Sequence, residues 1–279
     1  MNSLYSKHFL RRIFLPMFAR INPGDITIKH HYTKQPFRLH SFRHKNYWVH
    51  GKNREKETML LFGQLIKDGQ TVFELGAHIG YITLYLAQLV GDSGKVFVFE
   101  PGPDNFKYLE KNTTQKNITA IQKAVSDIDG QLPFYVEDFT GQNNSLIEGF
   151  EGLELNSEYA HVKSSYETIM MDVVKLDTVV PQLTSELDFI KIDVEGVELK
   201  VLHGAKQMID THQPIVMVES IDTDAEVLNY FTEIGYKLFS PEIGLIQDAS
   251  EMKNLNYFCV NPEKHHEAYE ILKQQTTRS

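Results

Sequence analysis

Acidic side chains stand at the ends of several apolar segments, where the sequence predicts that strands end. Glu74 lies at the tip of a first expected strand, Glu100 closes GKVFVFE, and Asp193 follows the apolar run LDFIKI. In an open parallel sheet, ligands bind outside the carboxyl ends of the strands. Carboxylates placed there can accept hydrogen bonds from hydroxyls, attract a cationic group or take up a proton.

Three acids follow the run 187–192 closely: Asp193, Glu195 and Glu198. The next segment has helical spacing, so Glu195 and Glu198 fall at a helix start, where the helix dipole favours a negative charge by about 0.3–1 kcal/mol. Asp193 precedes that helix and gains nothing comparable from it. Asp193 is therefore the acid whose placement most needs a functional explanation.

The stretch 71–90 predicts a buried strand, a glycine turn and an amphipathic helix, because the apolar period changes across Gly76-Ala77-His78-Ile79-Gly80. Gly76 can adopt a positive φ and let a ligand approach the backbone, and Gly80 would let the helix lie close to its strand. A dinucleotide fingerprint needs a further glycine, and Glu74 would repel a pyrophosphate. The turn therefore favours a cofactor with a cationic end, although a strand, turn and helix without ligand is the alternative.

Glu100 lies roughly twenty residues beyond this turn, where an acid binds the ribose diol of an adenosine cofactor and repels a 2′-phosphate. Ser126 and Asp127 follow the next expected strand, where the adenine of such a cofactor usually lies. Asp127 could accept from the exocyclic amine. Ordinary turn chemistry explains the same two residues nearly as well.

These residues need a doubly wound α/β sheet to position them. Parallel strands alternate with helices, and a late antiparallel pair closes the sheet. The expected strands are 71–75, 94–100, 118–125, 187–194, 214–219, 235–239 and 256–260. Helices are expected near 59–66, 81–90, 105–112, 197–209 and 225–234, and residues 265–279 are expected to form a polar tail. Alternation at 26–28 and 37–39 predicts short strands ahead of the main domain.

Composition bounds the possible functions. The chain has 279 residues, 42% of them hydrophobic, a formal charge of -9 and a pI of about 5.7, which argues against nucleic acid as a partner. Its single cysteine excludes internal disulfides and thiolate zinc clusters, and its twelve histidines show no paired metal-ligand spacing. No metal ligands are assigned.

Residues 1–20 are basic and apolar but too short and too charged to span a bilayer, so a cytoplasmic location is expected, with possible peripheral membrane or subunit contact through this segment.

The segments FELGAHIGYIT, VFVFEPGPDNFKYLEKN, GQNNSL and FIKIDVEGVELKVLHGA, in this order, resemble the motif set of the FkbM-type S-adenosylmethionine-dependent methyltransferases. KIDVEG-x-E followed by L-x-G-A is the most specific of them. The resemblance runs from about Trp48 to Cys259. It implies a class I methyltransferase-like doubly wound sheet over residues 51–279, preceded by an N-terminal extension over residues 1–50.

The resemblance also implies an O-methyltransferase that uses S-adenosyl-L-methionine and acts on a hydroxyl of a sugar, glycan or secondary metabolite. It places a cofactor-binding group around the methionine part, the ribose and the adenine, and a catalytic pair at the transferred methyl. The cofactor-binding residues are Glu74, Gly76, Ala77, His78, Gly80, Glu100, Ser126 and Asp127, and the catalytic residues are Asp193 and Glu195. His78 departs from the asparagine common in such turns.

Three alternatives stay open. A nicotinamide-dependent oxidoreductase would use the same ribose contact, and a non-catalytic module would keep the fold without the chemistry. If the protein is a methyltransferase, Asp193 would take the acceptor proton, and Glu195 is the alternative base. The competing mechanism uses both carboxylates to hold magnesium or calcium.

Overall fold

The structure, a computed structural model, describes residues 24–137, 141–148, 166–220, 226–253 and 255–276. The chain divides into two compact units, residues 1–54 and 55–279. The predicted surface segment 1–20 lies outside the described residues. Of the helices in the described ranges, none is both long enough and apolar enough to cross a lipid bilayer.

The described part of the first unit is a small hairpin followed by short helices. β1 (Asp25–Lys29) and β2 (Pro36–His40) pair antiparallel, which confirms the short strands predicted from alternation. α2 (Lys45–Val49) and the 3₁₀ helix η1 (Gly51–Asn53) follow. The Phe37 ring lies 5.8 Å from that of Tyr47, so an aromatic contact joins the hairpin to α2.

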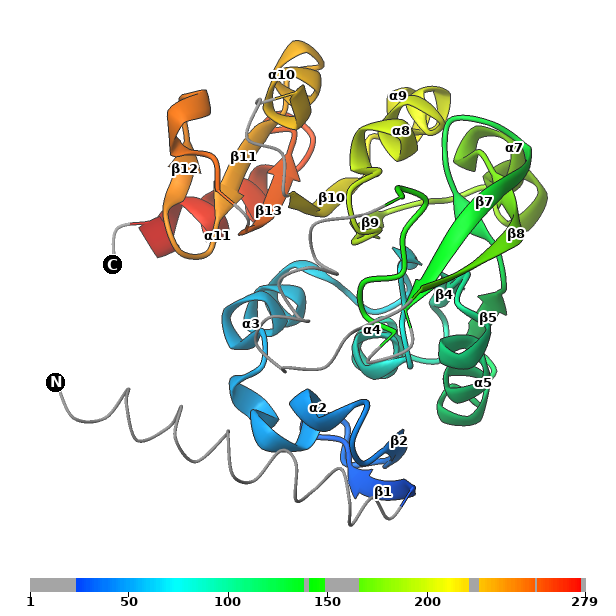
Figure 1. Ribbon diagram of the computed structural model, residues 1–279. Helices are drawn as coiled ribbons and strands as arrows, with labels where there is room; N and C mark the ends of the chain where they lie inside the picture. The colour runs from blue at the N-terminus through cyan, green and yellow to red at the C-terminus, as the bar shows by residue number, and fades with distance from the viewer. Residues whose placement is uncertain (1–23, 138–140, 149–165, 221–225, 254, 277–279) are drawn as a thin grey trace, which may run out of the picture. The chain divides into compact units, whose positions relative to one another are not determined.

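The second unit is built on an eight-stranded sheet of order β12-β11-β13-β10-β9-β3-β4-β5 (Figure 1). Its central strands are parallel, whereas β13 runs antiparallel to both β10 and β11. The strands are β3 (Thr71–Leu75), β4 (Lys95–Phe99), β5 (Ile118–Ile121), β9 (Phe189–Ile192), β10 (Ile215–Ser220), β11 (Lys237–Ser240), β12 (Gly244–Ile246) and β13 (Leu255–Val260). This confirms the doubly wound, mostly parallel sheet and its late antiparallel closure.

The order of the strands reverses at β3. From β3 the chain moves outward through β4 and β5, and it then returns to the other side of β3 as β9. In such sheets the ligand site lies at the carboxyl ends of the strands where this reversal occurs. Gly76 and Asp193 directly follow β3 and β9, so the topology brings these two distant segments to one point.

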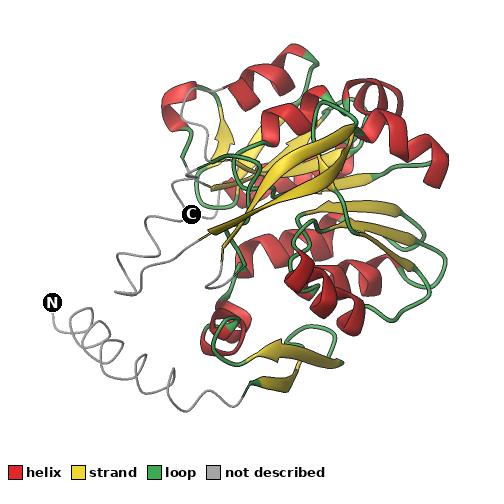
Figure 2. Ribbon diagram, turned by 45° about the vertical axis from the view of Figure 1, so that its right-hand side comes forward, coloured by secondary structure: helices red, strands yellow, loops and turns green. Residues whose placement is uncertain are grey.

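Helices lie on both faces of the sheet (Figure 2). The helices described in this unit are α3 (Lys56–Leu65), α4 (Tyr81–Val90), α5 (Pro103–Asn112), α7 (Leu176–Leu183), α8 (Glu198–His203), α9 (Lys206–His212), α10 (Glu226–Glu233), the 3₁₀ helix η2 (Ala249–Glu251) and α11 (His266–Thr276). Phe73, Leu75 and Ile190 belong to a large buried cluster formed by the sheet and its helices. Burial on both faces explains the near-continuous apolar runs of the central strands.

The predicted strand 118–125 is wrong as a single element. It divides into β5, in the main sheet, and β6 (Ala124–Val125), which joins β7 (Gly130–Glu137) and β8 (Tyr166–Val174) in a separate three-stranded sheet of order β6-β8-β7. Lys123 donates its N–H to the Ile121 carbonyl at 3.0 Å, so the chain turns between the two strands. β6 then takes its hydrogen bonds from β8, a partner that no local pattern identifies.

Two further predictions differ from the structure. The segment 197–209 contains two helices, because α8 ends at Gly204 and α9 begins after Ala205. The prediction of a polar tail over residues 265–279 is wrong. α11 occupies most of this segment, and Ala268 and Leu272, one helical turn apart, are both buried. Two apolar positions at this spacing are too few for a strong helical pattern, so packing rather than periodicity defines α11.

Candidate active site

Gly76 and Asp193 meet at the point where the strand order reverses. Gly76 has φ +80°, and a Cβ at this position would lie 1.7 Å from the carbonyl oxygen of Asp193. The Asp193 N–H donates to the Leu75 carbonyl at 3.1 Å. The positive φ predicted for Gly76 is confirmed. Its close neighbour is the backbone after β9, so this glycine holds the turn and the acidic segment together.

Gly80 has a different neighbour from the one expected. It precedes α4 with φ +87°, and an added Cβ would approach Leu109 at 2.9 Å and Thr113 at 3.0 Å. Both side chains belong to α5 or its end. Gly80 therefore permits close packing of α4 on α5 rather than on the strand before it.

Glu100 is a buried hydrogen-bond acceptor at the end of β4, 4% exposed. Its Oε2 accepts from the N–H of His78 at 2.7 Å, and its Oε1 accepts from the N–H of Gly102 at 2.8 Å and from Asn105 Nδ2 at 3.2 Å. Burial raises the pKa of Glu100 to about 7, although these three hydrogen bonds act in the opposite direction. His78 thus contributes through its backbone, at a strained φ of +49°.

Asn105 connects Glu100 to the loop that carries the motif GQNNSL, residues 141–146. Its Nδ2 also donates to the Gly141 carbonyl at 2.7 Å. At the other end of this loop, Ser145 Oγ donates to the Glu195 carbonyl at 2.7 Å. The described part of the loop, residues 141–148, therefore contacts both Asn105 of α5, which binds Glu100, and Glu195 after β9.

Glu74 lies inside the sheet rather than at its tip. It is 1% exposed, and its Oε2 accepts from Thr83 Oγ1 at 2.6 Å, while Oε1 is buried with no hydrogen-bond partner among the described residues. Burial raises the pKa of Glu74 to about 7, and attraction by the neighbouring Lys191 opposes this. Glu74 and Lys191 are partners in the register of β3 and β9.

The segment after β9 gathers acids around one lysine. Lys191 Nζ lies 2.9 Å from Asp193 Oδ2, with Lys191 1% and Asp193 25% exposed. Burial, followed by repulsion from Asp193, raises the pKa of Glu195 well above its ordinary value. Repulsion by Asp193 raises the pKa of Glu219, which is exposed at the end of β10, to about 8.

Glu195 and Glu198 hold their positions through the backbone. Glu195 has φ +56°, a strained conformation of the kind that concentrates at functional sites. Glu198 Oε1 accepts the N–H of Gly196 at 3.0 Å, so Glu198 is a structural group at the start of α8. Among the described residues, no three histidine, cysteine or acidic side chains are arranged to hold a metal ion.

Ser126 and Asp127 follow β6 rather than the main sheet. Ser126 is buried and donates its Oγ to Asp127 Oδ1 at 3.0 Å, and the Ser126 carbonyl lies where a Cβ on Gly204 would clash. Among the residues that the structure describes, no hydrogen bond joins this pair to Glu100 or Gly76. The adenine role of Ser126 and Asp127 stays a prediction.

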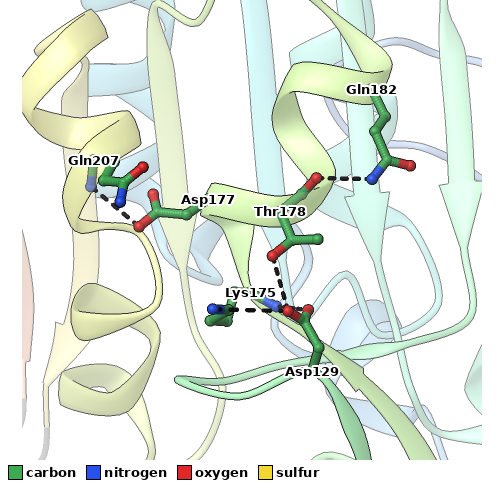
Figure 3. A network of polar contacts seen from close by, with 6 residues as sticks. All are labelled: Asp129, Lys175, Asp177, Thr178, Gln182 and Gln207. Carbon is green, nitrogen blue, oxygen red and sulfur yellow. Dashed lines mark hydrogen bonds and ion pairs between the residues drawn. The ribbon is translucent and has the colours of Figure 1, made fainter.

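The rest of this turn has a structural role (Figure 3). Asp129 accepts from the N–H of Lys175 at 2.9 Å and from Thr178 Oγ1 at 2.8 Å, and thereby fixes the start of α7. Asp177, in the first turn of α7, accepts from the N–H of Gln207 and thus caps α9. The hydrogen bonds of a turn and of a helix cap therefore explain Asp129 and Asp177, the acids of this region other than Asp127.

The sequence interpretation did not assign Lys191, Asn105 or Glu219 to the site. One signal for Lys191 was available, since it is the single charged residue inside the run FIKI, where each neighbour is apolar. Glu219 is an acid at a strand end, like Glu100. Asn105 binds Glu100, five residues before it, but its second contact, with Gly141, comes from a distant segment that no local pattern identifies.

The fold and the site together define a class I methyltransferase. The sheet is parallel except for its reversed C-terminal strands, a glycine turn follows β3, a buried acid ends β4, and further acids follow β9.

Comparison with known proteins gives the family. A family model for the methyltransferase FkbM domain matches residues 74–238, more than half of the chain. The protein belongs to the FkbM family and is an S-adenosylmethionine-dependent methyltransferase. This confirms the resemblance identified in the sequence.

Two curated relatives are similar over part of the chain. Methyltransferase 1 of Beauveria bassiana is 24% identical, with 62% of this chain and 73% of the relative covered. The 31-O-demethyl-FK506 methyltransferase FkbM of Streptomyces tacrolimicus is 30% identical, with 53% of this chain and 64% of the relative covered. The crystal structure of methyltransferase FkbM from Methylobacillus flagellatus aligns with a TM-score of 0.44 at 18% identity, covering 70% of this chain and 45% of that one.

Proposed function

We propose that this protein transfers a methyl group from S-adenosylmethionine to a hydroxyl oxygen of a small acceptor, a sugar or a secondary metabolite. The observation that carries the proposal is the position of Asp193. Its backbone contacts Gly76 of the glycine turn, and its partly exposed carboxyl lies at the carboxyl end of β9. The name of the Streptomyces relative, which specifies an O-demethyl substrate, supports oxygen as the acceptor atom.

The residues around the turn fit the cofactor. Glu100 is a buried acid that ends β4, and a ribose diol would donate to it. Glu74 has a buried oxygen without a hydrogen-bond partner among the described residues, and the cation that faces this side chain is Lys191. Gly76, Ala77, His78 and Gly80 would surround the methionine part, and Ser126 and Asp127 the adenine. Bound S-adenosylmethionine supplies a methyl group on a positively charged sulfur, which keeps the electron pair of the broken bond.

Asp193 would orient the acceptor hydroxyl and take its proton. Holding the acceptor oxygen in line with the methyl can contribute up to about 7–11 kcal/mol to lowering the barrier. A sugar hydroxyl is barely ionised at neutral pH, and a carboxylate base typically adds about 10²–10⁴ in rate. Burial raises the pKa of Glu195 well above its usual range, which disfavours its ionised form. This favours Asp193 as the base and leaves Glu195 a hydrogen-bonding role.

Calorimetry with S-adenosylmethionine, S-adenosylhomocysteine and NADH tests the cofactor. We expect both sulfur compounds to bind and NADH not to bind. Binding of NADH alone would indicate the oxidoreductase, and binding of none of the three would indicate a non-catalytic module.

Radioactive methyl transfer to a panel of glycosides and polyols, amines and thiols tests the acceptor class. We expect product only with hydroxyl compounds. Transfer confined to amines or thiols would refute O-methylation. Turnover that is lost in EDTA and restored by magnesium would replace base catalysis with the metal mechanism.

A further inference from the structure

Lys191 is a fully buried lysine in the middle of the central sheet. It occupies the third position of β9, with 1% of its side chain exposed, and it pairs in register with Glu74 on β3 and Met217 on β10. Lysine is almost never fully buried unless its charge is paired. Its ammonium reaches along the strand to Asp193, two residues later on the same face, at 2.9 Å.

Acids from several different segments interact with Lys191. Glu74 comes from β3, Glu219 from the end of β10, Glu55 from the residue before α3, and Glu195 from the turn after β9. Carboxyl groups this close cannot all ionise, because like charges disfavour one another's charged form. The Lys191 ammonium, at the centre of these acids, favours the charged form of the acid nearest to it.

The pattern of shifts indicates which acid benefits. Burial raises the pKa of Glu74 to about 7 and raises that of Glu195 well above its ordinary value, while repulsion raises that of Glu219 to about 8. Each of these shifts favours the neutral form of the acid. Asp193 is the acid in direct contact with the ammonium. Burial lowers the pKa of Lys191, but attraction by Asp193 and Glu74 outweighs this and raises it overall, so the lysine is charged.

We propose that Lys191 is a positioning residue of the methyl-transfer reaction, which holds Asp193 Oδ2 and keeps this carboxyl ionised so that Oδ1 can accept the proton of the acceptor hydroxyl. The inference rests on the proposed role of Asp193. It gives the buried lysine a function that packing does not require, because an apolar residue of similar length would fill the same space without a desolvated charge.

The test replaces Lys191 with methionine, which keeps much of the length and removes the charge. Phe189→Leu, on the same face of β9, is the matched control for altered packing. With ¹³C-labelled aspartate, and with the Asp193 signal assigned through Asp193→Asn, we expect the same Asp193 carboxyl signal at pH 7 in the wild type and in the control. In Lys191→Met it should move toward the protonated position. An unchanged signal in folded Lys191→Met would overturn the proposal.

Kinetics provide a second readout once an acceptor is identified. Lys191→Met should lower kcat at least tenfold at pH 7. The kcat of this variant should recover as pH rises, because at higher pH the Asp193 carboxyl loses its proton even without the neighbouring ammonium. A loss of equal size at every pH would indicate a merely structural role and contradict the inference.

If Lys191→Met does not fold, the double variant Lys191→Met/Glu74→Gln removes the buried cation together with an opposing acid. The same shift of the Asp193 signal is expected, and its absence refutes the proposal. Failure of the wild type to bind S-adenosylhomocysteine would instead refute the proposed function, so the two failures are distinguishable.

Discussion

Replacing Glu100 is the most informative perturbation of the cofactor site. Glu100→Ala removes the acceptor for three internal donors, at 2.7, 2.8 and 3.2 Å, and for the ribose diol proposed to bind there. Hydrogen bonds to a charged group contribute about 1.5–3 kcal/mol each. Loss of even one ligand contact of this size weakens binding at least tenfold, since a factor of ten corresponds to about 1.4 kcal/mol.

The same change destabilises the fold, because the donors left behind are buried. An unsatisfied buried donor costs about 1–3 kcal/mol, so we expect the free energy of unfolding of Glu100→Ala to fall by at least this amount. Glu100→Gln keeps the volume and one acceptor oxygen, and should affect both quantities less. Glu110→Ala, an exposed glutamate on α5, is the matched control and should change neither.

The pH dependence separates the carboxyl charge from the packing of the side chain. The folded-state pKa of Glu100 is raised from its ordinary 4.5 to about 7, so its contribution to stability is complete below 4.5 and is lost as pH rises through 7. Glu100→Gln lacks this loss. Its unfolding free energy relative to the wild type should therefore improve over this range by up to roughly 3 kcal/mol.

Urea unfolding at several pH values and calorimetry with S-adenosylhomocysteine measure these effects. Folded Glu100→Ala that binds S-adenosylhomocysteine within twofold of the wild type would refute the ribose role of Glu100. A stability difference between wild type and Glu100→Gln that does not change with pH would refute the raised pKa of its carboxyl.

Other predictions follow from the same geometry. Gly76→Ala should lower the free energy of unfolding by more than about 1–3 kcal/mol, and by more than Gly235→Ala does. Gly235 is the control, because it has a similar φ of +82° but open space around it. Equal losses in urea unfolding would contradict the close approach of Gly76 to Asp193. With an acceptor, Asp193→Asn should lower kcat about a hundredfold or more and leave S-adenosylhomocysteine affinity within a fewfold, whereas full activity would remove Asp193 from the mechanism. Because repulsion by Asp193 raises the pKa of Glu219 from its ordinary 4.5 to about 8, the free energy of unfolding should fall as pH rises through this range, and Glu219→Gln should lack this part of the fall in urea unfolding; an identical pH dependence in the variant would contradict the shift. Deleting residues 1–20 should reduce solubility or oligomer size, measured by light scattering, more than cofactor affinity; the opposite result would assign the segment to the site.

Much of the sheet was predictable because its evidence is local. β3, β4, β9 and β10 are short runs of apolar β-formers, and the change of period at 76–80 marks the turn into α4. Alternating strands and helices restrict the topology to a right-handed doubly wound sheet. The sequence by itself therefore determined that Glu100 and Asp193 would end strands at one edge, together with the order of the family's motifs.

Other features depended on partners that no local pattern names. β6 left the main sheet because β8, about fifty residues later, supplies its hydrogen bonds, and α11 formed because packing covers its few apolar side chains. Asn105 reached the site through contacts with Glu100 and Gly141.

The position of Lys191 is the clearest case. The sequence shows a lysine inside an apolar run, but only the register of β9 with β3 and β10 places it among acids from separate elements. The charge state of a buried group depends on burial and on every neighbouring charge, and these come from segments far apart in the chain. Tertiary structure alone could therefore decide which carboxyl at this edge remains ionised.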